Sequence, residues 1–120
     1  MTTQWAADAP AHKGRWVAIC APDRLTPDRG VAALVDGVEV AIFFLADGEL
    51  LAIDNLDPFS GAPVLSRGLV GDVAGAPTVA SPVYKQRFDL RTGKCIDDES
   101  VALRTWPVRL AGASIEVRGS

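Results

Sequence analysis

Histidine and cysteine are scarce in this chain, which has one histidine and two cysteines among 120 residues. The single histidine, His12, stands near the amino terminus. No imidazole is therefore available in the body of the chain as the general base of a Ser–His–Asp arrangement, which sets a hydrolase of that type aside even though Ser81 and Asp57 are both present.

Positive charge is also limited, because 12 lysines and arginines face 15 aspartates and glutamates, for a formal net charge of −3. The basic residues are scattered rather than clustered. Nucleic-acid binders usually carry a basic stripe that neutralises phosphates, and anionic membranes attract runs of Lys and Arg. The composition therefore argues against nucleic acid and against a membrane as partners.

Long apolar runs and a basic-then-apolar leader are missing as well. The longest apolar run, residues 40–45, is of strand length and far from the roughly 18 residues that a membrane helix needs. The amino terminus does not have the architecture of a secretory signal. We therefore expect a cytoplasmic protein in which Cys20 and Cys95, both on predicted strands, are reduced thiols rather than a disulfide.

What is present is a series of short apolar segments separated by turn residues. The clearest part is residues 31–55, where Asp36-Gly37 and Asp47-Gly48 each predict a two-residue hairpin turn and hence a three-stranded antiparallel meander. Residues 55–77 contain four glycines and three prolines, which predicts a long loop, and long loops tend to be functional. Further strands are expected at residues 15–20, 78–81, 86–90, 103–110 and 114–118.

Period-two alternation predicts which side chains share a face. Val38, Val40 and Ile42 fall on one face of the meander, and Trp106, Val108 and Leu110 are expected to form a buried face near the carboxyl terminus. Pro107 lacks a backbone donor, so its strand should be an edge strand or carry a bulge. Short strands at this spacing are typical of an all-β, antiparallel β-sandwich or small barrel. We expect one domain, residues 14–120, preceded by a flexible tail, residues 1–13.

The order of these features, together with the strings "AIDNLDPFSGA" and "ASPVYKQRFDL", resembles the Rieske-type iron–sulfur protein fold. In that family a two-iron two-sulfur cluster is held between a loop with Cys-x-His and a loop with Cys-x-x-His. The resemblance places Asp57 and Phe59 at the ligand positions of the first loop (about residues 55–77), and Ser81 and Tyr84 at those of the second (residues 81–86). All four ligands are absent, so the cluster-binding subdomain is degenerate.

The residues at these positions do not suit a metal. Asp57 and Tyr84 are oxygen donors, Ser81 is a weak one, and Phe59 cannot bind a metal, a set that fits neither sulfide-bridged iron nor zinc. The whole chain has too few cysteines and histidines for two thiolates and two imidazoles in this subdomain. We predict that the chain binds no metal or cofactor, has no catalytic residue of its own, and is not an electron-transfer ferredoxin.

The strings "DPFSGAPVLSRG" and "SPVYKQRFDL" are more specific than the fold, and they resemble the small subunit of the assimilatory NAD(P)H-dependent nitrite reductases. The resemblance implies a cytoplasmic two-component oxidoreductase of nitrogen metabolism that reduces nitrite to ammonium. It also implies a large catalytic subunit that carries FAD, siroheme and a four-iron four-sulfur cluster and takes electrons from NADH or NADPH. This chain would be its cofactor-free companion. The alternative is a free-standing interaction or regulatory module built on the same degenerate frame.

The two degenerate loops are the predicted contact surface for that partner. Apolar and aromatic side chains anchor interfaces, and polar residues surround them. The predicted anchors are Pro58, Phe59, Val83 and Tyr84, and the predicted polar rim is Arg67, Lys85 and Gln86. Phe59 and Tyr84 have a second role open to them, which is to turn inward and fill the volume that the cluster would occupy, and we expect this filling role for both. For Arg67 and Lys85 we expect the role of an ordinary solvated charge rather than that of an interface anchor.

Overall fold

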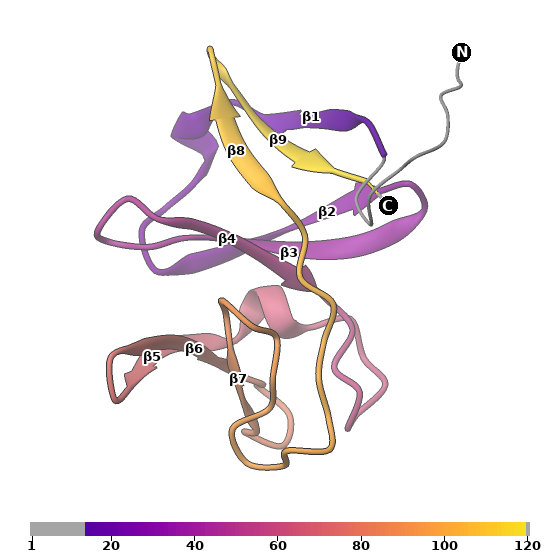
Figure 1. The fold of residues 1–120 in the computed structure, drawn as a ribbon, viewed down its shortest axis with the longest axis vertical. Coiled ribbons are helices and arrows are strands. Elements are labelled where there is room, and N and C mark those ends of the chain that lie inside the picture. The colour runs from indigo at the N-terminus through magenta and orange to yellow at the C-terminus, as the bar shows by residue number, and fades with distance from the viewer. Residues whose placement is uncertain (1–13, 120) are drawn as a thin grey trace.

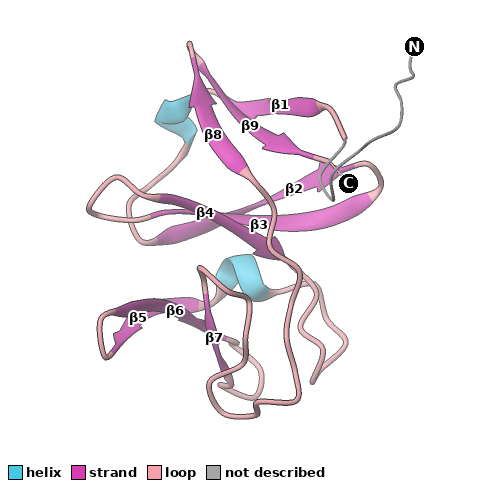
Figure 2. Cartoon of the chain, viewed as in Figure 1, coloured by secondary structure: helices cyan, strands magenta, loops and turns pink. Residues whose placement is uncertain are grey.

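The structure is a computed structural model that describes residues 14–119. The predicted tail, residues 1–13, lies outside the described residues, and His12 with it. Within the described residues, nine strands form three three-stranded antiparallel sheets, in the orders β1-β9-β8, β2-β3-β4 and β5-β6-β7 (Figures 1 and 2). The strands are β1 Trp16–Cys20, β2 Arg29–Val35, β3 Val38–Phe44, β4 Leu50–Asp54, β5 Leu69–Val73, β6 Ala76–Ala80, β7 Arg87–Asp89, β8 Val108–Ala111 and β9 Ser114–Arg118.

Between residues 14 and 119 the other regular structure is two short 3₁₀ turns, η1 Pro22–Arg24 and η2 Leu65–Arg67. The described residues thus form the all-β architecture that the sequence predicts, with sheets that are open at both edges rather than closed into a barrel. Within this part of the chain no helix has the length and apolar character needed to cross a membrane.

The first hairpin turn follows the sequence prediction and the second does not. Asp36 and Gly37 both have positive φ angles, 50° and 81°, which are the signature of a type I′ turn between β2 and β3. At the second turn only Gly48 has a positive φ. Asp47 instead accepts the backbone N–H of Glu49 with its carboxylate. The β3–β4 connection is therefore a longer loop, so the expected two-residue turn is wrong there.

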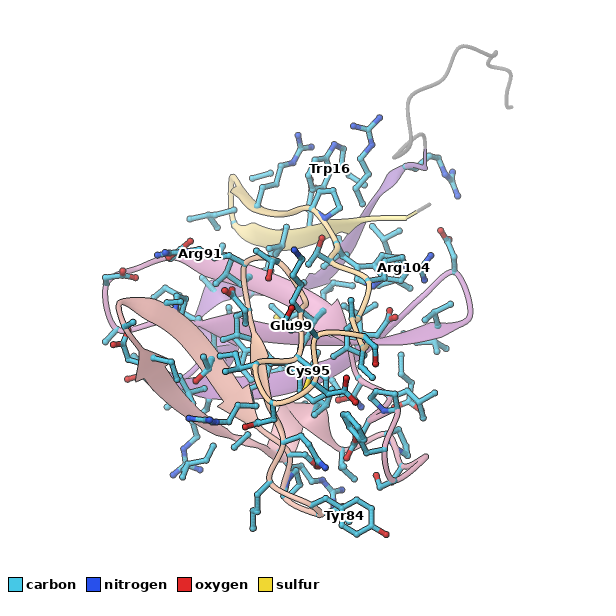
Figure 3. The ribbon with its side chains drawn as sticks, turned by 60° about the horizontal axis from the view of Figure 1, so that its bottom comes forward. Trp16, Tyr84, Arg91, Cys95, Glu99 and Arg104 are labelled. Atoms are coloured by element: carbon cyan, nitrogen blue, oxygen red, sulfur yellow. The ribbon has the colours of Figure 1, made fainter. Side chains whose placement is uncertain are left out.

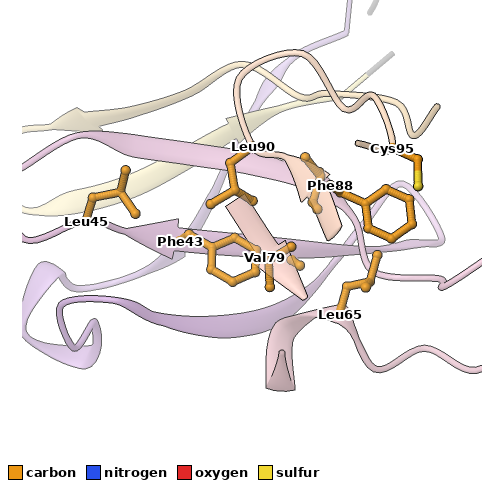
Figure 4. Close-up of a cluster of buried hydrophobic side chains, with 9 residues drawn as sticks. Phe43, Leu45, Leu65, Val79, Phe88, Leu90 and Cys95 are labelled. Carbon is orange, nitrogen blue, oxygen red and sulfur yellow. The ribbon is translucent and has the colours of Figure 1, made fainter. Parts of the chain in front are cut away.

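Strand β3 lies between two hydrophobic cores, because the meander is the middle layer of the molecule (Figure 1). Val40 and Ile42 face a core that includes Trp106 and Val117. Ala41 and Phe43 face the opposite core, which contains Phe88 and Cys95 among its buried members (Figure 4). All four β3 side chains are fully buried. The predicted alternation is confirmed, and both faces are covered.

The long loop expected over residues 55–77 is shorter than predicted. From Leu69 the chain forms β5, which pairs with β6 through a turn at Ala74 and Gly75. The sequence conceals this hairpin because Gly71 and Pro77 lie inside its strands and β5 is largely solvent-exposed. Strands β6, β7 and β9 fall within or overlap the segments where the sequence predicts strands.

Near the carboxyl terminus, β8 starts directly after Pro107 and forms an edge of its sheet, as proline predicts. Trp106 is buried, and its indole N–H donates to Asp54. Leu110 is 55% exposed, so the predicted buried face shared by Trp106 and Leu110 is wrong. Val108 still packs against the core that contains Trp106, but Leu110, further along β8, lies beyond the cover of that core.

Both cysteines are free thiols, as the sequence predicts. Cys20 lies on β1. Cys95 lies outside the named strands, in an isolated bridge opposite Phe88. Its side chain is buried in the core that also contains Phe88 and Val79. The expectation that Cys95 stands on a strand is therefore corrected, and its side chain belongs to the core against which Phe59 of the first degenerate loop packs.

Candidate functional site

Two loops meet at one end of the molecule, and we call them the tip loops. The first, residues 55–64, connects β4 to η2, and the second, residues 81–86, connects β6 to β7. A hydrogen bond of 2.5 Å from Ser81 Oγ to Asp57 Oδ2 joins them. The four positions that the sequence assigns to former cluster ligands all lie in these loops, one pair in each.

Asp57 organises the first tip loop from a fully buried position. Its Oδ1 accepts the backbone N–H of Phe59 at 2.9 Å, and its Oδ2 accepts the hydroxyls of Ser60 at 2.9 Å and of Ser81. Burial by itself raises the pKa of Asp57, but the hydrogen bonds, that from Ser81 foremost, outweigh it and hold the pKa below its ordinary value. The carboxylate is therefore ionised at neutral pH and tied to both loops.

Ser81 has the equivalent place in the second tip loop and is also fully buried. Its hydroxyl donates to Asp57 and accepts the N–H of Val83 at 3.2 Å. Its backbone N–H bonds the carbonyl of Gln86 at 2.9 Å, and its carbonyl accepts the N–H of Lys85, a residue with a φ of 69°. These bonds close the second loop into a tight turn around Ser81.

Asn55 fixes the start of the first tip loop and was not singled out by the sequence analysis. It is 1% exposed. Its amide nitrogen donates to the carbonyl of Pro63 at 2.9 Å and to Glu39 at 3.3 Å, and its side-chain oxygen accepts the N–H of Ser66 at 2.7 Å. The only sequence signal for this role is a polar amide directly after a buried strand, where loop backbone groups need partners.

Phe59 and Tyr84, at the two former histidine positions, point in opposite directions. Phe59 is half-buried and packs on the core, with its ring centroid 6.1 Å from that of Phe88. This is the predicted filling role. Tyr84 is 61% exposed and projects from the far end of the molecule (Figure 3). The filling role expected for Tyr84 is therefore wrong, because its side chain is exposed to solvent and does not pack on the core.

The remaining predicted contact residues lie at different places around the tip. Pro58 and Val83 are exposed, and so is Leu56, which the sequence analysis missed. Lys85 is exposed, and its ammonium group donates to the carbonyl of Pro82. Gln86 is half-buried, and within the described residues its Oε1 atom is buried without a hydrogen-bond partner. Arg67 stands outside the tip loops, on η2.

The side chains at the tip do not fit an iron–sulfur cluster. A Rieske centre takes two thiolates on one iron and two imidazoles on the other. Here Asp57 and Ser81 are bonded to each other, Phe59 has no donor atom, and Tyr84 points away. Across residues 14–119, no three His, Cys, Asp or Glu side chains gather in a way that could hold a metal ion.

The three-sheet fold with paired tip loops defines a class of protein. The model of the Rieske-like [2Fe–2S] domain family matches residues 15–118, nearly the whole described chain. The chain belongs to this family and, within it, to the nitrite reductase small subunits, as its relatives show.

Three relatives illustrate the likeness. The small subunit of the NADH nitrite reductase of Salmonella typhimurium is 42% identical over 107 residues, which cover 88% of this chain and 98% of the relative. A crystal structure from Mycobacterium tuberculosis that carries the name of an NADH-dependent nitrite reductase small subunit has 46% identity and a TM-score of 0.86, covering 89% of this chain and 96% of that one. The large subunit of the NAD(P)H nitrite reductase of Klebsiella oxytoca is 42% identical over 113 residues, 93% of this chain but only 12% of the relative.

Proposed function

We propose that this chain is the small subunit of a cytoplasmic NAD(P)H-dependent nitrite reductase, which reduces nitrite to ammonium. We further propose that it binds and shapes a large catalytic subunit and carries no electrons itself. The observation that carries this proposal is the hydrogen bond between Asp57 and Ser81, because these residues stand where a cluster-bearing relative needs two thiolates. Membership of the family supports the assignment to nitrite reductase. The replacement of the cluster ligands supports a role without electron transfer.

The redox chemistry is assigned to the partner. Reduction of nitrite to ammonium takes six electrons, and side chains alone offer no series of one-electron carriers. We propose that the large subunit holds FAD, siroheme and a four-iron four-sulfur cluster and accepts electrons from NADH or NADPH. In the Klebsiella relative, a segment similar to this chain occurs within a much longer polypeptide named as the large subunit. Such a covalent link raises the effective concentration of one unit for the other and supports a working partnership between them.

The exposed part of the tip is the proposed docking surface. Leu56, Val83 and Tyr84 are 51%, 44% and 61% exposed. Pro58, two residues after Leu56 in the first tip loop, is also exposed. Exposed apolar and aromatic side chains on a closed, hydrogen-bonded loop lose little conformational freedom on binding, which suits them as interface anchors. Phe59 supports this surface from below. Lys85 and Gln86 are placed to form its polar rim, and Arg67 lies further along the chain, on η2.

The test uses both subunits of the same organism. The large subunit is purified alone and together with this chain, and nitrite-dependent oxidation of NAD(P)H is measured in each preparation. We expect the two chains to co-purify and the complex to oxidise NAD(P)H faster than the large subunit alone. Full activity of the large subunit alone, with no complex formed, would overturn the proposal.

A further inference from the structure

A groove separate from the tip surface lies where β2 begins and η2 ends. Its volume is about 500 Å³. The two elements are in contact, and the groove lies between them. Its lining residues are Asp28, Arg29 and Gly30 on one side and Ser66, Arg67, Gly68 and Leu69 on the other.

Two glycines fix the shape of this groove. A Cβ atom added at Gly30 would lie 2.4 Å from the carbonyl oxygen of Ser66, and one at Gly68 would lie 2.4 Å from the carbonyl oxygen of Ala80. Both are backbone contacts that cannot relax easily, so only glycine allows β2, η2 and β6 to approach this closely. The close packing holds Arg29 and Arg67, each next to one of these glycines, at the walls of the groove.

The charges in the groove are not compensated. Four arginines of the chain pair with carboxylates, in Arg87–Asp97, Arg91–Glu49, Arg104–Asp54 and Arg109–Glu116, whereas Arg15, Arg24 and Arg118 form no ion pair within residues 14–119. Within residues 14–119 the guanidinium groups of Arg29 and Arg67 form neither a hydrogen bond nor an ion pair. Asp28 is the one carboxylate of the lining, and its Oδ1 accepts the N–H of Ala46. Two cations therefore face one anion in the groove of a chain whose net charge is negative.

An exposed apolar side chain completes this groove. Leu69 is 79% exposed, more than any other large hydrophobic residue among the described ones. The groove also adjoins the base of the tip loops, because Ser66 is bonded to Asn55 and Gly68 packs against the residue before Ser81. The groove thus combines two arginines, a residue type enriched among interface anchors, with an exposed apolar side chain that a partner can cover.

We propose that this groove is a second docking surface, which receives an acidic segment of the partner chain. Carboxylates of that segment pair with Arg29 and Arg67, whose planar guanidinium groups suit two-point contacts with a carboxylate, and an apolar side chain of the segment covers Leu69. Because the rest of the molecule is acidic, this groove also directs where such a segment lands and sets its orientation. The identity of the partner as the nitrite reductase large subunit rests on the proposed function.

The test compares two charge-reversed variants of the full chain in binding to the purified large subunit. The first is Arg29→Glu with Arg67→Glu. The matched control is Arg24→Glu with Lys94→Glu, which changes the net charge equally at two exposed positions outside the groove. Far-ultraviolet circular dichroism and urea unfolding establish that both variants fold. The dissociation constant is then measured at low and at high salt.

We expect the groove variant to bind about tenfold more weakly than the control at low salt, with a smaller difference at high salt, because screening reduces the effect of exposed charges. Equal binding by the two variants at low salt overturns the groove and leaves the proposed function standing. If the unaltered chain itself does not bind the large subunit, the proposed function and the assigned partner fail together.

Discussion

Ser81 Oγ donates a 2.5 Å hydrogen bond to Asp57 Oδ2, and both residues are fully buried. They belong to different loops and stand at the positions where a Rieske-type centre places its two thiolates on a single iron. The hydrogen bond therefore joins the same two loops that the metal would join. Its length is typical of a hydroxyl donating to an ionised carboxylate, which is among the stronger hydrogen bonds in proteins.

Removal of the Asp57 carboxylate should destabilise the protein. In Asp57→Ala the buried hydroxyl of Ser81 and the N–H of Phe59 lose their acceptor, and we expect the free energy of unfolding to fall by about 2–4 kcal/mol. The measurement is urea unfolding at pH 7. Asp72→Ala is the control, since exposed Asp72 also accepts a turn N–H, that of Gly75, and should cost about 1 kcal/mol or less. Equal losses in both variants would contradict a special role for Asp57.

The contribution of Asp57 should depend on pH in a defined direction. Its folded-state pKa lies below the unfolded value of about 3.9, so the unfolded chain binds more protons in this range. The stability that the ionised carboxylate contributes is complete above about pH 4 and is lost as the pH falls through the folded-state pKa.

This pH dependence is measured as the difference in unfolding free energy between the wild type and Asp57→Asn, from pH 7 to pH 2. The gap should be widest at neutral pH and should narrow below about pH 4, because protonated aspartic acid and asparagine are then both neutral. Other acids with a lowered pKa, such as Asp97, are common to both proteins and cancel. A gap that stays constant over the whole range would rule out this role for the Asp57 charge.

A substitution at Phe59 should lower the stability of the protein, whereas one at Tyr84 should weaken binding to the large subunit. Phe59→Ala removes a ring that packs on the core beside Phe88 and should lower the free energy of unfolding by about 1–3 kcal/mol. Tyr84→Ser should leave stability within about 0.5 kcal/mol, because the ring is largely exposed. The same Tyr84→Ser variant should weaken binding to the large subunit about tenfold or more if this ring is an interface anchor.

The control for Tyr84 is Leu110→Ser, at a position of similar exposure on β8, outside the tip loops. It should bind the large subunit like the wild type. If Tyr84→Ser and Leu110→Ser bind equally well, Tyr84 is not part of the docking surface.

Asn55 should matter as much as Asp57, although its only sequence signal is a polar amide directly after a buried strand. Asn55→Ala leaves the N–H of Ser66 and the carbonyl of Pro63 without their partner, and we expect a loss of about 2–3 kcal/mol in unfolding free energy. Hydrogen exchange provides the second measurement. Relative to the wild type, exchange in the variant should become faster in the first tip loop and in η2, and should change less in the β2-β3-β4 meander. If exchange instead became faster to the same extent throughout the chain, Asn55 would not act locally on the first tip loop.

The sequence predicts most of the fold because local signals agree with the final structure. Asp36-Gly37 marks a hairpin by its chemistry, and the alternation in β3 assigns its two buried faces. Strand β5 is hidden because its pairing partner determines it more than its own residues do. The predicted burial of Leu110 fails because period-two alternation does not show which residues of a strand are covered by other elements.

The site is predicted in position but not in geometry. Motif spacing locates Asp57, Phe59, Ser81 and Tyr84 in two facing loops. It cannot show that Asp57 and Ser81 bond to each other, since that depends on the docking of segments 24 residues apart. It also cannot distinguish the directions of Phe59 and Tyr84, because these depend on how each loop packs against the core and not on residue type.

We propose that a hydrogen bond, and no metal cluster, joins the two tip loops. This proposal is tested most directly by measuring iron and acid-labile sulfide in the purified chain after anaerobic incubation with ferrous iron and sulfide, followed by desalting. The account predicts neither element in stoichiometric amount and no visible sulfide-to-iron absorption bands. About two irons and two sulfides per chain, the content of a Rieske centre, would contradict it.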